Sequence, residues 1–120
     1  MQDLESQLKE DLSKIGLDVK FKLSIRPYSK SYFGRYDVIA DTVILYVWET
    51  PNGDLYPYIK ILLTAVHESI HHKQWNDPNF KRIRGVMHDP EFKRLYNKYS
   101  DRAKARVLFK EVQSRYVVPN

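Results

Sequence analysis

The hydrophobic and polar positions in the first half of the chain predict one helix followed by three strands. Apolar residues recur every three or four positions up to residue 15, which favours a helix that ends at Gly16. Between residues 19 and 25 apolar positions alternate with polar ones, as expected of a half-buried strand. Segments 35–40 and 42–48 are rich in Val, Ile and Tyr and predict two more strands. The apolar run within 42–48 is continuous, which is typical of a strand at the centre of a sheet.

The second half of the chain predicts helices. From residue 58 to residue 75 the apolar positions follow helical spacing. Another helix is expected to begin at Asp89, with this aspartate as N-cap and Pro90 in the first turn. A last helix is expected over residues 100–116, with these residues facing inward: Ala105, Leu108, Phe109, Val112 and Tyr116. One helix, a small sheet of about three strands and then an H-E-x-x-H-bearing helix with two C-terminal helices make an α+β fold.

The composition supports one domain and excludes several classes of protein. The chain has 120 residues, of which 42% are hydrophobic, and this suits a single domain over residues 1–120. Because there is no cysteine, disulfide scaffolds, thiol nucleophiles and cysteine-based zinc sites are excluded. No apolar run is long enough for a membrane span and no secretory signal is visible, so we expect a cytoplasmic monomer without membrane contacts.

The net charge of +5 is unevenly distributed along the chain. Residues 1–80 carry a net charge of −2, whereas residues 81–120 carry a net charge of +7. Such a basic segment suits an anionic partner, with nucleic acid as the usual candidate, but it suits a solvated surface equally well.

The helix predicted over residues 58–75 contains an H-E-x-x-H motif, His67-Glu68-Ser69-Ile70-His71. Side chains four residues apart lie one above the other on a helix, so both imidazoles can bind one metal ion. Glu68 is then beside the ion, where its carboxylate can take a proton from zinc-bound water. His72 points about 100° away from His71 around the helix axis, and we expect it to be a surface or supporting residue.

A catalytic zinc ion takes three protein ligands, so the motif needs one more. We expect His88, because it immediately precedes the N-cap Asp89 and is therefore held by the start of a helix. The longer motif H-E-x-x-H-x-x-G-x-x-H is absent, since Gln74 occupies the glycine position. Two carboxylates remain as alternative third ligands: Glu91 and Asp77.

These motifs resemble the SprT-like metallopeptidase domain, the catalytic module of Spartan-type proteases. That family pairs H-E-x-x-H with a downstream H-G-x-x-F at the start of a helix, and this chain has H-D-P-E-F beginning at His88. The resemblance implies a zincin-like fold in which His67, His71 and His88 bind Zn²⁺ and Glu68 is the general base. Phe92 matches the packing aromatic residue of the family motif.

The resemblance also implies an activity, namely hydrolysis of peptide bonds in proteins, including proteins covalently trapped on DNA. Asp89 replaces the usual glycine after the third histidine, and the cysteine-rich zinc ribbon of many relatives is absent. The chain therefore looks like a minimal form of the domain, of a kind familiar from bacteria and their phages. In a phage protein the expected location is the host cytoplasm.

Basic residues near the expected metal site are candidates for DNA contacts, with single-stranded DNA favoured. They are Lys81, Arg82, Arg84, Lys93, Arg94 and Lys98. Trp75 and Phe80 lie beside this run and are candidates for base stacking, although core packing is the more common role of such residues. Two alternative functions stay open: a DNA- or protein-binding module with a structural zinc ion, and a general intracellular peptidase that does not depend on DNA.

Overall fold

The computed structural model describes residues 3–81, 83 and 85–115 of the chain. Its elements follow the order α1 (Leu4–Lys14), β1 (Lys22–Arg26), β2 (Gly34–Asp37), β3 (Thr42–Tyr46), α2 (Tyr58–Asn76) and α3 (Pro90–Arg115). Within these residues the fold is α+β, with three helices and one three-stranded mixed sheet. The predicted fold class and the predicted small sheet are therefore confirmed.

The sheet has the strand order β1-β3-β2, so the strand with the continuous apolar run is central, as predicted. β1 runs parallel to β3, and β2 runs antiparallel to it. The three middle residues of β3 are almost fully buried: Val43, Ile44 and Leu45. β2 is thus an edge strand, and it also contacts α2.

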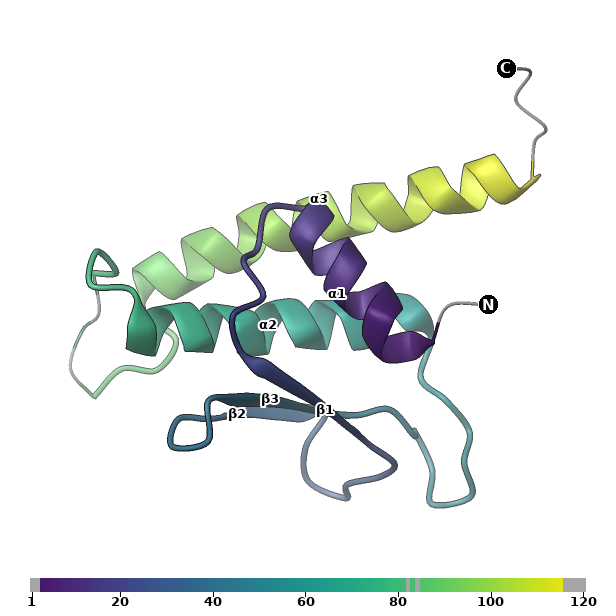
Figure 1. Ribbon diagram of the computed structural model, residues 1–120, viewed down its shortest axis with the longest axis horizontal. Coiled ribbons are helices and arrows are strands. Elements are labelled where there is room, and N and C mark those ends of the chain that lie inside the picture. The colour runs from purple at the N-terminus through teal and green to yellow at the C-terminus, as the bar shows by residue number, and fades with distance from the viewer. Residues whose placement is uncertain (1–2, 82, 84, 116–120) are drawn as a thin grey trace.

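Helix α2 lies at the centre of the molecule, between the sheet and α3, while α1 packs against both α2 and α3 (Figure 1). The residues of α2 that belong to the hydrophobic core are Ile61, Leu62, Ala65, Val66 and Ile70. Because three sides of α2 are covered, polar residues on it are buried as well. No helix in the described part of the chain combines the length and apolar character that a membrane span requires.

The helix ends follow the predicted signals. Gly16 follows the C-cap of α1 with a positive φ of 100°, a conformation that glycine adopts without strain. Asp89 caps α3, since its Oδ1 accepts a hydrogen bond from the Phe92 amide at 2.8 Å. Its Oδ2 accepts from the Ile83 amide at 3.2 Å, so the same carboxylate also holds the preceding loop.

The prediction of two C-terminal helices is wrong, because α3 runs without a break from Pro90 to Arg115. Ser100 was expected to begin a new helix, but it is buried and its hydroxyl donates to the Asn97 carbonyl within the helix. The predicted inward face beyond it is also wrong: Leu108 and Phe109 are each 60% exposed and Val112 is 44% exposed. Ala105 is exposed too, and Tyr116 lies outside the described residues. The cause is visible in Figure 1, where the C-terminal part of α3 extends past the other elements.

A buried carboxylate joins the three helices. Asp11 of α1 is fully buried and accepts hydrogen bonds from the Tyr58 hydroxyl of α2 and from Arg106 Nε of α3, the latter at 2.5 Å. Lys110 Nζ lies 3.0 Å from both carboxylate oxygens. Burial acts to raise the pKa of Asp11, but these donors outweigh it and the pKa is lowered. The carboxylate is therefore ionised and ties α1 to α2 and α3.

Candidate metal centre

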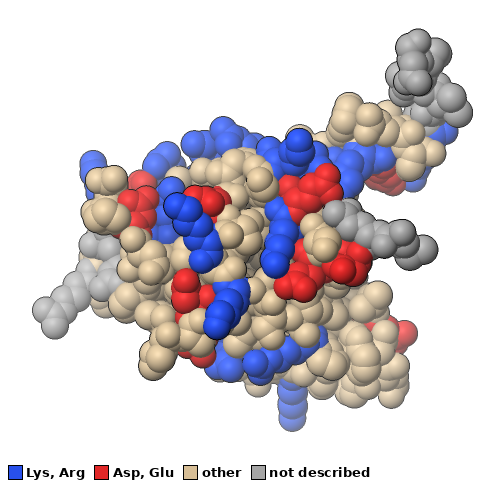
Figure 2. Space-filling view, viewed as in Figure 1, with Lys and Arg blue, Asp and Glu red and all other residues tan. Residues whose placement is uncertain are grey.

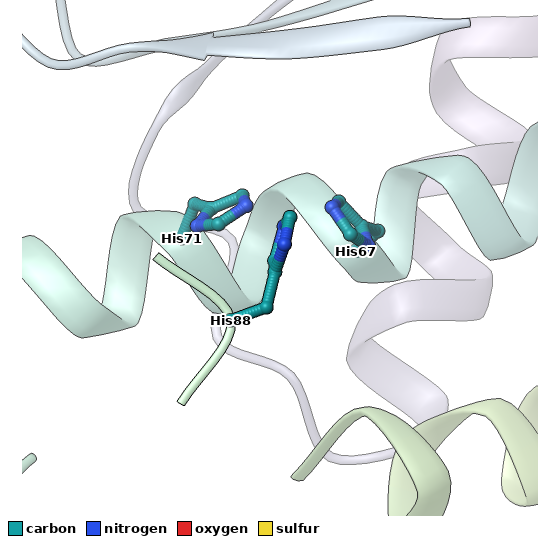
Figure 3. Close-up of side chains that lie close together, drawn as sticks. All are labelled: His67, His71 and His88. Carbon is teal, nitrogen blue, oxygen red and sulfur yellow. The ribbon is translucent and has the colours of Figure 1, made fainter. Parts of the chain in front are cut away.

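Three histidines from two parts of the chain meet beside α2. His67 and His71 come from successive turns of α2, and His88 comes from the loop before α3 (Figure 3). One ring nitrogen of each residue lies within 4.8 Å of the others. The ring centroids are 5.0 Å apart for His67 and His71, 5.0 Å for His67 and His88, and 5.1 Å for His71 and His88. Among the described residues this is the one group of three or more potential side-chain ligands found close enough for a shared ion.

Phe92 supports this cluster from the first turn of α3. Its ring is 3% exposed, and its centroid lies 5.0 Å from His67, 4.5 Å from His71 and 4.9 Å from His88. Asp89 fixes the main chain at this point through its cap hydrogen bonds. The loop residue His88 is thus placed by the start of α3, as the sequence pattern predicted.

Gln74 connects the second histidine to the loop that carries the third. Its Nε2 donates to the Met87 carbonyl at 2.9 Å, and its Oε1 lies 3.0 Å from His71 Nδ1. Because the carbonyl can only accept, the amide nitrogen must face Met87 and the amide oxygen must face His71. His71 therefore donates from Nδ1, and its lone pair is on Nε2.

Burial favours the neutral form of His67 and His71. It lowers the pKa of His67 to about 4, with a smaller effect from the nearby His71 and His88. The pKa of His71 is also lowered, mainly by burial. Neutral imidazole is the form that binds a metal ion, so at neutral pH these residues need not lose a proton first.

Glu68 is buried on the same helix, with 6% of its surface exposed. Burial raises the pKa of Glu68 to about 7. A carboxyl group with a pKa near the working pH can both take up and return a proton. Glu68 and His67 line one cavity, together with Tyr96 of α3, whose ring centroid lies 5.7 Å from that of His67.

The two alternative ligands have other partners. Glu91 accepts hydrogen bonds from Arg94 at 2.7 and 3.0 Å. Asp77 accepts from the Asn79 amide at 2.9 Å and lies 3.5 Å from Lys73 Nζ. Neither carboxylate belongs to the histidine group.

His72 faces a different set of polar residues from the three clustered histidines. Its Nδ1 lies 2.7 Å from Asp41 Oδ1, which also accepts from the Tyr36 hydroxyl at 2.5 Å. Asn76 donates to the same hydroxyl at 3.0 Å. These contacts attach α2 to the turn between β2 and β3.

The candidate DNA contacts are dispersed. Lys93 lines a cavity with His67 and His88, whereas Arg94 is paired with Glu91 and Lys98 lies 5.4 Å from the Tyr99 ring. Lys81 is exposed, and Arg82 and Arg84 lie outside the described residues. Figure 2 shows basic side chains interspersed with acidic ones on the face in view. Of the four predicted residues that the structure describes, Lys93 is the one that lines a cavity with the histidines.

The two candidate stacking residues differ in exposure. Trp75 is 42% exposed at the end of α2, whereas Phe80 is partly buried and packs against the hydrophobic core. Core packing therefore accounts for Phe80.

Two residues of this site, Gln74 and Tyr96, were not predicted as site residues from the sequence. Gln74 follows His71 by three residues, a spacing that places both on one face of a helix, so its position was a usable signal. Tyr96 gave no such signal, because its contact with His67 depends on how α3 packs on α2.

The fold and site define an α+β protein with a three-histidine cluster beside its central helix. No family model matches the chain, and no curated protein or solved structure matches it either.

Proposed function

We propose that the protein is a zinc-dependent peptidase in which His67, His71 and His88 hold the ion and Glu68 is the general base. The observation that carries this proposal is the meeting of three imidazoles beside a buried glutamate. The three ring nitrogens lie within 4.8 Å of one another, so a point between them is at most about 2.8 Å from each nitrogen. A zinc–imidazole bond is about 2.0–2.1 Å long, so shifts below about 1 Å per side chain complete the site. The purely nitrogen donor set also suits zinc.

The chain's own residues then have distinct tasks. When bound, zinc supplies a Lewis acid that polarises a carbonyl group and makes water more acidic. Glu68 accepts a proton from the attacking water on a carboxylate oxygen and passes it to the amine that leaves. The Tyr96 hydroxyl, on an α3 side chain that lines the same cavity, is a donor for the negative charge that develops on the carbonyl oxygen.

The resemblance to SprT-like domains supports proteins bound or crosslinked to DNA as the substrates. Lys93, beside His67 and His88, is the residue best placed to contact a phosphate near the site. Single-stranded DNA is the favoured partner, because exposed aromatic residues such as Trp75 can stack on unpaired bases.

A structural zinc ion would fit the arrangement less well. Structural sites take four protein ligands and are closed, whereas catalytic sites keep one position open. The cluster found among the described residues offers three ligands, and His67 lines two cavities. The cavities beside His67 leave space for a substrate next to the proposed ion, and this supports a catalytic site.

The deciding experiment compares zinc-loaded wild type with Glu68→Gln on DNA-binding proteins, with and without single-stranded DNA. We expect cleavage by the wild type, stimulated by DNA, and at least a hundredfold loss in Glu68→Gln at unchanged zinc content. Absence of cleavage under all conditions would refute a peptidase, and equal cleavage without DNA would favour the general peptidase.

The ligand set is tested separately by zinc affinity. His88→Ala should bind zinc far more weakly than wild type, with Glu91→Ala as the matched control in the same segment. If His88→Ala keeps wild-type affinity while Glu91→Ala loses it, the third ligand has been assigned to the wrong residue.

A further inference from the structure

A cavity of about 330 Å³ opens beside the catalytic face of α2. One wall is α2 itself, with His67 and Glu68 at one end, and the opposite wall includes Phe33 and Tyr32 from the segment that leads into β2. Its volume accommodates a side chain or a short stretch of peptide. Whatever occupies it lies next to the residues that carry the proposed chemistry.

Lys60 lies on the same face of α2 as the metal ligands. It precedes His67 by seven residues, which is close to two helical turns, so the two side chains lie in one row about 10 Å apart along the axis. Lys60 lines the cavity together with His67. A bound peptide that passes His67 in an extended conformation would reach Lys60 after about three residues.

The Lys60 ammonium group is held at the cavity wall by an aromatic ring. Its Nζ lies 4.0 Å from the centroid of Phe33, a distance typical of a cation–π contact. The Phe33 ring is itself packed edge-on against Tyr56, with 5.5 Å between centroids. No carboxylate of the described residues lies within ion-pair distance of Lys60, so its charge is not neutralised by a salt bridge there.

The cavity lining is otherwise poor in charge. Among its described residues Lys60 is the one lysine or arginine and Glu68 the one carboxylate, and Glu68 lies beside the metal cluster. The rest of the wall is aromatic, aliphatic and hydroxyl-bearing, with Tyr32 58% exposed and Phe33 50% exposed. Such a wall suits a ligand whose apolar chain ends in a negatively charged group.

We propose that Lys60, held over Phe33, binds a carboxylate of the peptide substrate and directs cleavage to bonds within about three residues of it. The inference rests on the proposed peptidase function. The carboxylate belongs either to an acidic side chain or to the C-terminus of the peptide, and both present the same chemistry to Lys60. An acidic side chain would make the enzyme selective for sequence, and a terminal carboxylate would make it a trimming enzyme.

Cleavage of defined peptides distinguishes these cases. Peptides that carry Glu, Gln or Lys at each position near the centre are offered with free and with amidated C-termini, and products are mapped by mass spectrometry. Wild type should prefer Glu peptides or free C-termini by about two- to fivefold in kcat/KM, the scale of an exposed ion pair. Dependence on the C-terminal amide separates the two sources.

Matched variants assign the preference to Lys60. Lys60→Gln should lose the preference for a carboxylate because KM for the preferred peptides rises, with little change in kcat. Lys60→Glu should favour the Lys peptides. Phe33→Leu should weaken it partially, because the ammonium group loses its aromatic support. Lys104→Gln removes an exposed lysine of α3 that does not line the cavity, and it should behave as wild type.

Two failures are distinguishable. If wild type cleaves peptides without preferring a carboxylate, or if Lys60→Gln retains the preference, the inference about Lys60 is wrong while the peptidase stands. If wild type cleaves no peptide, the cleavage of DNA-binding proteins described above still decides the proposed function, and the affinity of fluorescent Glu and Gln peptides decides the binding claim. Equal affinities for the Glu and Gln peptides, or the same affinities in Lys60→Gln as in wild type, would overturn the claim that Lys60 binds a carboxylate.

Discussion

Replacing Gln74 tests whether the hydrogen bonds around the histidines determine metal affinity. Gln74→Met keeps the length of the side chain but removes both of its hydrogen bonds, to His71 Nδ1 and to the Met87 carbonyl. Gln74 is 4% exposed, so water cannot readily replace either partner. Two buried hydrogen bonds of about 1 kcal/mol each predict a loss of about 2 kcal/mol in stability. Loss of a hydrogen bond to a ligand histidine typically weakens metal binding by about 10–100-fold.

The assay is competition for zinc against a chromophoric chelator, together with thermal denaturation of the metal-free protein. Gln113→Met makes the same substitution at an exposed position near the end of α3 and should leave both quantities unchanged. Gln74→Glu keeps an acceptor for His71 but loses the donor to Met87. It should therefore retain zinc better than Gln74→Met if orientation of His71 is the dominant effect.

A Gln74→Met protein that binds zinc within twofold of wild type would refute the reasoning. It would mean that the two α2 histidines and His88 hold the ion without help from this amide. A large loss of stability without a loss of zinc affinity would assign Gln74 to folding alone.

Three other predictions concern the fold. Asp11→Asn should lower the temperature midpoint of denaturation at pH 6–8. Because the pKa of Asp11 is lower in the folded state than in the unfolded state, the ionised carboxylate stabilises the fold above the unfolded pKa. This stabilisation fades below about pH 4, where the midpoints of wild type and Asp11→Asn should converge. Gly34→Ala should destabilise by about 1–3 kcal/mol in thermal melts, because the new Cβ would lie 2.8 Å from the Ile44 carbonyl oxygen. Phe109→Ala should change stability by less than about 0.5 kcal/mol, whereas the buried Phe21→Ala should cost about 3–5 kcal/mol; equal losses would contradict the exposed end of α3.

The parts of the site that the sequence predicted depend on local geometry. The spacing of His67 and His71 places both on one face of any helix, whatever surrounds it. His88 was predicted because Asp89 and Pro90 mark a helix start, and such a start fixes the residue before it. These signals lie within a few residues of each other, so they can be identified without knowledge of the tertiary fold.

The parts that the sequence did not predict depend on contacts between distant segments. Ser100 followed by Asp101 resembles a helix start, but nothing in the local sequence shows that the preceding turns continue through it. Leu108, Phe109 and Val112 have helical spacing but are exposed, because on their side of α3 the described residues do not cover them. Contacts such as Tyr96 with His67 and Lys60 with Phe33 require the packed structure.

The position of the site on α2 has a physical consequence for its precision. Val66 and Ile70, the residues beside the motif, are fully buried, so the backbone that carries His67 and His71 is fixed by the same packing that stabilises the fold. His88 is on a loop, and its position depends on two polar side chains, Asp89 and Gln74. We therefore expect His88, the proposed third ligand, to be the adjustable one, and changes in Asp89 or Gln74 should weaken metal binding as well as lower stability. Substitutions at Val66 or Ile70 should lower stability first, because both side chains are fully buried in the core.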